Sequence, residues 1–133
     1  MCVFCSIVKG EIPSSKVYED DQYLAFLDLS QATLGHTLVI PKKHFDNLES
    51  CDPEVAAGLI KTVQKVEARI TKALGISEFN VLTNQGPTAG QSVNHLHFHI
   101  LPRQDGDDID IKFVDHKPEI ADLAILADKI KNA

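Results

Sequence analysis

The sequence predicts an α+β protein built on a largely antiparallel five-stranded sheet. Five segments have the β-branched and aromatic composition of strands, and only two have helical periodicity. Hairpin-like connections join the strands, which favours segregated strands and helices over a parallel α/β fold. The 133 residues contain no internal repeat, low-complexity tract or linker, so we expect a single domain over residues 1–133.

The first three strands are predicted in the N-terminal third of the chain. Residues 15–20 and 23–28 form the first two strands, and the turn between them is Asp20-Asp21-Gln22. The β-branched apolar run at residues 37–40 reads as a buried strand that Pro41 ends. These strands form the first half of the expected sheet.

A long central helix follows, with signals at both of its ends. Asp52 can cap it, Pro53 suits its first position and Gly75 supplies its stop. Apolar residues recur at helical spacing along it, at Val55, Leu59, Val63, Val66, Ile70 and Leu74. The amphipathic pattern predicts that this helix packs one face onto the sheet.

Two more strands and a second helix complete the prediction. Residues 79–83 and 94–102 read as strands, and the loop from Asn84 to Val93 between them is rich in glycine and polar residues. Pro118 opens a C-terminal helix. Apolar residues lie on one side of that helix, at Ile120, Leu123, Ala127 and Ile130.

Composition and charge exclude several classes of function. A net charge of −6 makes duplex nucleic acid an improbable partner, although local donors can still hold a small phosphate. The sequence contains no run of about 18 apolar residues, so we expect no membrane span. The N-terminus lacks a basic region followed by an apolar block, so we expect a cytoplasmic protein.

Three cysteines are present, which is an odd number and argues against a disulfide framework. Cys2 and Cys5 form a C-x-x-C pair, whose spacing suits either a metal site or a redox motif. His44 and His95 are candidates for the two ligands that a closed, structural tetrahedral zinc site would still need. A pair of free thiols is the alternative.

Three histidines alternate with apolar residues at His95, His97 and His99. On a strand their imidazoles share one face and the apolar residues pack into the core. The first and third positions lie about 13 Å apart, too far to share one ion bound at about 2 Å. The triplet must therefore divide its roles, and His97 and His99 remain for chemistry if His95 holds zinc.

A neutral imidazole is a competent nucleophile at physiological pH, and phosphorus is a suitable electrophile for it. The loop just upstream, residues 86–92, has small residues that let backbone N–H groups approach anionic oxygens. Ser92, Gln91 and Asn84 add side-chain donors. The pattern therefore predicts nucleophilic attack by a histidine on a phosphate ester or amide.

The segment Gln91–Leu101, with its His-φ-His-φ-His-φ-φ pattern (φ being apolar), resembles the signature of the histidine triad (HIT) family. Glu11-Ile12-Pro13, residues 24–28 and residues 36–44 resemble other family segments in the same order. The resemblance covers roughly residues 1–103. It implies a HIT-like α+β subunit that pairs into a homodimer with one continuous sheet.

The resemblance also implies hydrolysis or transfer at the α-phosphorus of an adenosine nucleotide derivative, such as a phosphoramidate. By position in the motif, His97 would be the nucleophile that forms a nucleotidyl-histidine, and His99 would bind phosphate oxygens. His36 would set the protons of the triad. Ser92 would assist at the phosphate with Asn84, Gly90 and Gln91.

The remaining assignments by resemblance concern the nucleoside and a metal. Asp28 would accept from the ribose hydroxyls. The base pocket would be lined by Phe4, Ile7, Phe26, Leu27, Leu29 and Leu38. Some bacterial-type members carry structural zinc on residues that match Cys2, Cys5, His44 and His95.

Two alternatives to a phosphoramidase remain open at this stage. One is a dinucleoside polyphosphate hydrolase that uses the same residues. The other is a zinc-stabilised nucleotide-binding regulatory module with little turnover of its own. Because His99 keeps the third histidine, the chain differs from the uridylyltransferase branch of the family, which has Gln there.

Overall fold

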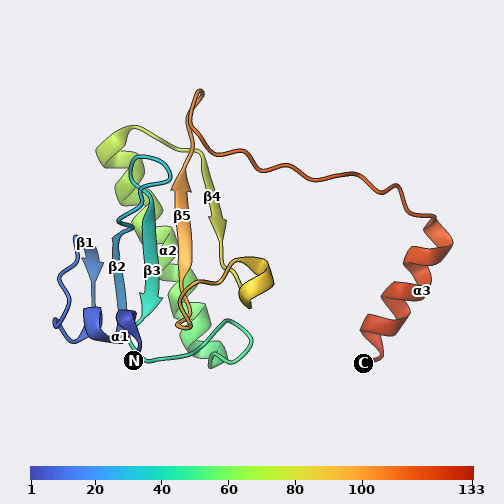
Figure 1. The fold of residues 1–133 in the computed structure, drawn as a ribbon, viewed down its shortest axis with the longest axis horizontal. Coiled ribbons are helices and arrows are strands. Elements are labelled where there is room, and N and C mark those ends of the chain that lie inside the picture. The colour runs from blue at the N-terminus through green and yellow to red at the C-terminus, as the bar shows by residue number, and fades with distance from the viewer.

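The computed structural model describes residues 1–133, and its centre is the antiparallel sheet that the sequence predicts (Figure 1). The strand order is β1-β2-β3-β5-β4, and every neighbouring pair is antiparallel. The bounds of the strands are Lys16–Glu19 (β1), Tyr23–Leu27 (β2), Thr37–Pro41 (β3), Phe79–Leu82 (β4) and Phe98–Pro102 (β5). The predicted α+β class with five strands is confirmed, and β1 and β4 form the two edges.

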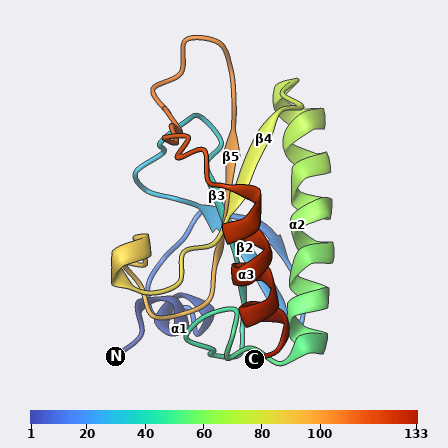
Figure 2. The same cartoon turned by 90° about the vertical axis from the view of Figure 1, so that its right-hand side faces the viewer.

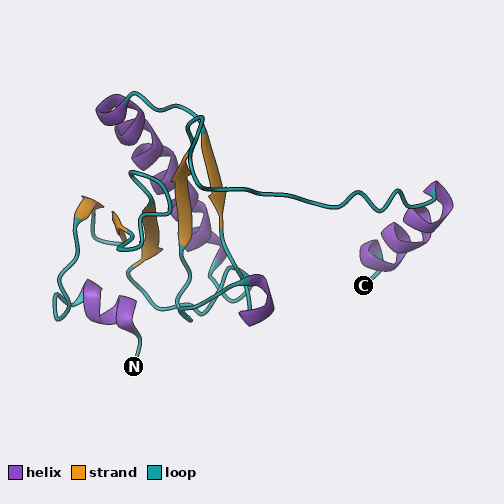
Figure 3. Ribbon diagram, turned by 45° about the horizontal axis from the view of Figure 1, so that its top comes forward, coloured by secondary structure: helices purple, strands orange, loops and turns teal.

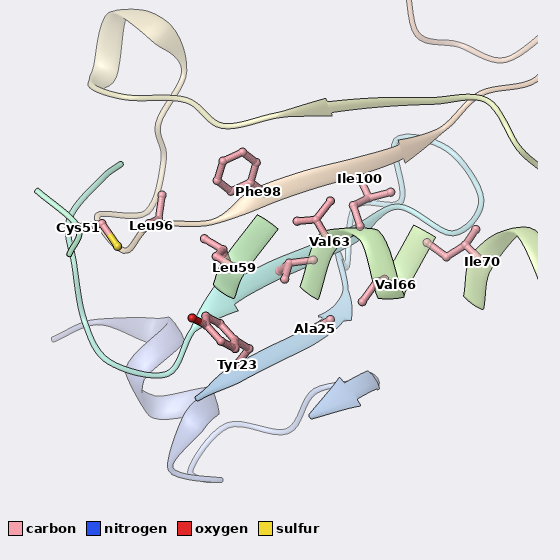
Figure 4. Close-up of a cluster of buried hydrophobic side chains, with 11 residues drawn as sticks. Tyr23, Ala25, Cys51, Leu59, Val63, Val66, Ile70, Leu96, Phe98 and Ile100 are labelled. Carbon is pink, nitrogen blue, oxygen red and sulfur yellow. The ribbon is translucent and has the colours of Figure 1, made fainter. Parts of the chain in front are cut away.

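The long helix α2, Pro53–Leu74, covers one face of the sheet. Its apolar stripe meets the sheet residues Ala25, Val39 and Phe98, which follow one another across β2, β3 and β5. Figure 4 shows the side chains of this cluster between α2 and the strands. The cluster consists of Tyr23, Ala25, Val39, Cys51, Leu59, Val63, Val66, Ile70, Leu96, Phe98 and Ile100.

The opposite face of the sheet carries the short helix α1, Val3–Val8, which the sequence analysis did not predict. Its Phe4 and Ile7, three positions apart, pack on Leu24, Phe26 and other residues of the second strand phase. This helix explains why β2 and β3 are buried on both faces and read as continuous apolar runs.

Two local predictions need correction. The strand expected at 94–102 begins only at Phe98, because the N–H of Leu96 donates instead to Phe45 O at 2.7 Å, outside the sheet ladder. Asp52 precedes α2 but its side chain makes no capping hydrogen bond, since its carboxylate faces Lys43 Nζ at 3.8 Å. Gly75 does end the helix in the left-handed conformation, as expected.

The C-terminal helix α3, Ile120–Lys131, exists but lies away from the rest of the molecule (Figures 1 and 3). An extended segment carries it past the β4 edge, and none of its residues is buried. The expectation of one domain over residues 1–133 stays a prediction. No helix in the structure has the length and apolar character needed to cross a membrane.

Candidate functional site

A cavity of about 260 Å³ opens between α1 and the sheet face on which it packs. A row of paired residues crosses the sheet there, from Phe26 on β2 through Leu38 on β3 to His99 on β5. Most of the predicted nucleotide-site residues line this cavity: Phe4, Ile7, Phe26, Leu27, Asp28, Leu29, Leu38, Ser92, His97 and His99. The structure thus gathers them from α1, β2, β3 and the histidine segment.

The protonation of His97 follows from a backbone contact. Its Nδ1 lies 2.6 Å from the carbonyl oxygen of His95, and a carbonyl can only accept. The neutral ring therefore donates through Nδ1–H and keeps its lone pair on Nε2. Thr83 fixes the same stretch of backbone by donating to His97 O at 2.8 Å. His97 is buried, yet its ring forms part of the cavity wall.

A second chain of hydrogen bonds fixes the proton of His99. The backbone N–H of Ala32 donates to His36 Nδ1 at 3.2 Å, so neutral His36 carries its proton on Nε2. That Nε2 lies 2.9 Å from His99 Nδ1 and donates to it. His99 is left with a proton on Nε2. His36 does not line the cavity, and it contacts the cavity residues His99 and Asp28 from behind.

Burial keeps this group of imidazoles uncharged. It lowers the pKa values of His97 and His36 below the ordinary histidine value, and Asp28 opposes the effect at both. For His99, burial together with the neighbouring His97 and His36 lowers the pKa to about 4. At neutral pH the site therefore combines a free imidazole lone pair with a neutral N–H donor.

Asp28 remains ionised at the edge of the cavity. Burial raises its pKa, but hydrogen bonds from the hydroxyl and the N–H of Ser30, together with the nearby His36 and His99, lower the pKa overall. Its other oxygen lies 3.6 Å from His36 Nε2. Asp28, His36 and His99 also lie close enough to hold an ion. The hydrogen bond between the two rings, however, occupies the nitrogens that would bind it.

The loop before the histidines is arranged differently from the expected anion cradle. Asn84, Gly90 and Gln91 do not line the cavity. Gln91 instead braces the loop, because its amide nitrogen donates to Asp46 O at 2.6 Å and its amide oxygen accepts from Gly86 N at 2.9 Å. The N–H groups of residues 89–91 are hydrogen-bonded within the loop. Ser92 is exposed, and its hydroxyl and N–H have no acceptor within the chain.

Several cavity residues were absent from the sequence-based prediction: Val3, Ile12, Pro13, Ser14, Ser15 and Val93. Ser14 is notable because its hydroxyl is buried without a hydrogen-bond partner. A turn of helix at residues 3–8 could have been inferred from the i, i+3 spacing of Phe4 and Ile7. Leu29, in contrast, is fully exposed at the rim of the cavity.

A second cluster joins the N-terminus to the start of the histidine segment. The ligand atoms of Cys2, Cys5, His44 and His95 all lie within 4.8 Å of one another. His95 Nδ1 is 3.4 Å from Cys2 Sγ and 3.6 Å from Cys5 Sγ, and His44 Nδ1 is 3.4 Å from Cys5 Sγ. In a tetrahedral zinc site the sulfur–nitrogen edge measures roughly 3.6 Å from the usual bond lengths.

The outer hydrogen bonds of this cluster suit metal ligation as well. His95 Nε2 donates to Pro41 O at 2.8 Å, and His44 Nε2 donates to Asp46 Oδ1 at 2.9 Å. Each bond leaves Nδ1 unprotonated and directed at the thiols, as is usual for a metal-binding histidine. The four residues therefore fit a tetrahedral zinc ion with no position left for a substrate.

Comparisons with known proteins agree with this geometry. The family model described as "HIT domain" matches residues 9–106. The chain belongs to the HIT family. The matched segment contains the triad and most of the cavity wall, so the predicted fold family and its bacterial-type character agree with the comparisons.

Individual HIT relatives cover most of the chain. An uncharacterized HIT-like protein of Methanocaldococcus jannaschii is 47% identical over 85% of this chain and 87% of its own length. The adenosine 5′-monophosphoramidase hnt1 of Schizosaccharomyces pombe is 46% identical over 77% of this chain and 74% of its own. The crystal structure of SMU.412c from Streptococcus mutans superposes with a TM-score of 0.95 at 48% identity, covering 98% of this chain and 83% of that one.

Proposed function

We propose that this HIT protein hydrolyses adenosine nucleotide derivatives, such as phosphoramidates, at the α-phosphorus through a nucleotidyl-His97 intermediate. The observation that carries the proposal is the hydrogen bond from His97 Nδ1 to His95 O, because it leaves the Nε2 lone pair of a cavity-wall imidazole for attack. A HIT relative that is named as an adenosine monophosphoramidase supports the choice of substrate class.

In the first step, the bond from His97 Nε2 to phosphorus forms as the bond to the leaving amine or phosphate breaks. A proton passes to the leaving group through Ser92, whose hydroxyl is free, or from the substrate itself. The ring of His97 becomes cationic in this step. Its hydrogen bond to His95 O then becomes charge-assisted and strengthens, which stabilises the intermediate more than the ground state.

In the second step, water attacks phosphorus and gives up a proton to solvent, the bond to His97 breaks, its ring becomes neutral again and the nucleoside monophosphate leaves. His99 Nε2–H donates to a non-bridging oxygen in both steps, and His36 holds it in that orientation. His99 is neutral before substrate binds, so it forms no ion pair with the carboxylate of Asp28. Its Nε2–H therefore stays available to the negative charge that develops on the phosphate oxygen.

The rest of the cavity is suited to the nucleoside. Phe26 and Leu38 on the sheet and Phe4 on α1 offer apolar surfaces to a purine, and Asp28 offers a carboxylate to ribose hydroxyls. Asn84, Gly90 and Gln91 act in this proposal mainly by holding Ser92 and the histidine segment in place. The same cavity would also accept one half of a dinucleoside polyphosphate.

The proposal includes structural zinc on Cys2, Cys5, His44 and His95. Bound there, zinc would supply stability by tying α1 to the histidine segment, and no catalytic water. Phe4 links the two sites, because its ring packs edge-on against both His95 and His97, with ring centroids 5.8 and 5.1 Å apart. The cluster thereby fixes one wall of the substrate cavity.

A homodimer is also part of the proposal. The β4 edge of the sheet is unpaired, and Val81 on it is exposed. Pairing of β4 with its copy would give one continuous sheet and remove a hydrogen-bonding edge from solvent. Light scattering of the purified protein measures this directly, and a monomer at micromolar concentration would exclude it.

Mass spectrometry during turnover tests the chemical proposal. The protein is mixed with adenosine 5′-phosphoramidate, quenched within milliseconds and digested, and a mass increase of one adenylate is sought on the peptide that contains His97. His97→Asn is the control, because it keeps a polar side chain of similar size. Product release without adenylate on His97 would exclude the covalent mechanism, and binding without product would favour a regulatory module.

A further inference from the structure

The C-terminal helix α3 has an apolar stripe that nothing in its own chain covers. At 100° per residue, Ile120, Leu123, Leu126, Ala127 and Ile130 share one side, and the acidic residues of the helix lie outside that stripe. Exposed apolar residues also occur on the segment before it, at Ile111, Phe113 and Val114. A helix of twelve residues is marginal alone in water, so this one needs a partner surface.

The position of α3 is shared with the crystal structure of SMU.412c from Streptococcus mutans. The Streptococcus mutans structure superposes over 98% of this chain with a TM-score of 0.95, a coverage that includes the extended segment and α3. A segment without contacts to its own body would adopt many positions in solution. Its agreement with an independent structure indicates that a neighbour outside the chain holds it in place.

A groove of about 280 Å³ lies on the far side of the subunit, between the C-terminal half of α2 and the β1–β2 side of the sheet. Its walls are largely apolar, and the exposed side chains of Leu34 and Leu74 stand at its rim. The groove is lined by Val17, Leu27, Gln31, Leu34, Gly35, Thr37, Val66, Arg69, Ile70, Ala73 and Leu74. This surface is thus a second unpartnered apolar feature of the same chain.

We propose that α3 of one copy docks in this groove of a second copy, so that the two chains exchange their C-terminal helices. In Figure 1 the extended segment leaves past β4 and carries α3 in the direction in which the sheet would continue. If two β4 edges pair about a twofold axis normal to the sheet, the second subunit occupies the space between β4 and α3 of the first. α3 then arrives beside β1 of the second subunit, at the opposite edge of its sheet.

The depth and the length of the segment fit this arrangement. Figure 2 shows α3 at the depth between the sheet and α2, where the groove lies, and a twofold axis normal to the sheet preserves that depth. A five-stranded sheet is about 19 Å wide at the usual strand spacing. The extended residues 110–119 span at most about 33 Å, so they can cross it.

The inference rests on the dimer that was proposed with the function, but not on the phosphorus chemistry. Cross-linking of the full-length protein tests it. Leu126→Cys on α3 and Ala73→Cys at the groove are combined in one chain and treated with a short bismaleimide, and the two single variants serve as controls for the native cysteines. A covalent dimer specific to the double variant is expected. A link only within the monomer, or none, would overturn the proposal.

Matched charge variants give a second readout. Leu123→Asp places a carboxylate in the apolar stripe, and Ala121→Asp places it on the other side of the same helix. Leu123→Asp is expected to raise the dimer dissociation constant at least tenfold in sedimentation experiments, with Ala121→Asp unchanged. Equal behaviour of the two variants would contradict the exchange. Hydrolysis of adenosine 5′-phosphoramidate by the same samples reports separately on the proposed function.

Discussion

His95 and His97 stand two residues apart on one face of the chain, yet the structure prepares them for different chemistry. His95 donates from Nε2 to Pro41 O and directs Nδ1 at two thiols, whereas His97 donates from Nδ1 to His95 O and keeps Nε2 free at a cavity wall. Both rings are neutral and buried. For each ring, one backbone carbonyl thus decides which nitrogen is available: Pro41 O for His95 and His95 O for His97.

The largest expected effect concerns the catalytic role proposed for His97. His97→Asn removes the proposed nucleophile, and kcat/KM for adenosine 5′-phosphoramidate should fall by about four orders of magnitude or more. The melting temperature and the zinc content should remain those of the parent protein. His116→Asn, the same substitution on the exposed extended segment, is the control. Activity within tenfold of the parent would rule out His97 as the nucleophile.

The second-largest effect concerns the proposed zinc site that includes His95. Cys5→Ser removes one thiolate from the proposed zinc site, and the protein should then lose stoichiometric zinc in elemental analysis. Metal present at about 1,000 times its dissociation constant stabilises a fold by about 4 kcal/mol. For a chain of this size the melting temperature should therefore fall by roughly 10–15 °C. Cys51→Ser, at the buried cysteine outside the cluster, should leave the zinc content unchanged.

The different placement of His95 and of the pair His97 and His99 could largely be predicted from the sequence, because alternation on an extended chain is a local property. The periodicities of 2 and 3.6 residues located the five strands and α2, and the motif placed His97 and His99 on the cavity side. The apolar residues Phe26 and Leu38 also reached the cavity as predicted, since strand pairing sets them in one row with His99.

What the sequence could not supply depends on contacts between distant residues. The tautomer of His97 is set by a carbonyl, and the protons of His99 are set by a ring 63 residues away, so neither follows from local spacing. The hydrogen bond of the Gln91 amide to Asp46 O joins residues 45 positions apart, so it too could not be read from local spacing. The six-residue helix α1 leaves only the i, i+3 spacing of Phe4 and Ile7 as a signal in the sequence, and the burial of Phe4 depends on the tertiary structure.

A smaller effect sharpens the comparison without removing a ligand. Asp46→Ala takes away the acceptor of His44 Nε2–H, which orients that ring toward Cys5. Loss of such an outer-shell partner typically weakens metal binding by about 10–100-fold. We expect that loss in a competition assay with a zinc chelator, and near-parent activity when zinc is saturating. Asp21→Ala in the β1–β2 turn is the matched control, and equal zinc affinity of the two variants would contradict the proposed role of Asp46.

The last effect concerns pH and follows from the lowered pKa of His99. In the folded protein this ring titrates near pH 4, but in the unfolded chain it titrates near the ordinary value of about 6.5. Between these values the unfolded state binds a proton that the folded state does not, so stability falls as the pH decreases from 6.5 toward 4. His99→Gln should flatten this part of the profile in denaturant titrations, because glutamine does not titrate. Nitrogen-detected NMR should show the neutral Nε2–H tautomer of His99 in the upper part of this range, well above pH 4. A His99 resonance that titrates near pH 6.5 would mean that the ring is more hydrated than its contacts with His36 and His97 indicate.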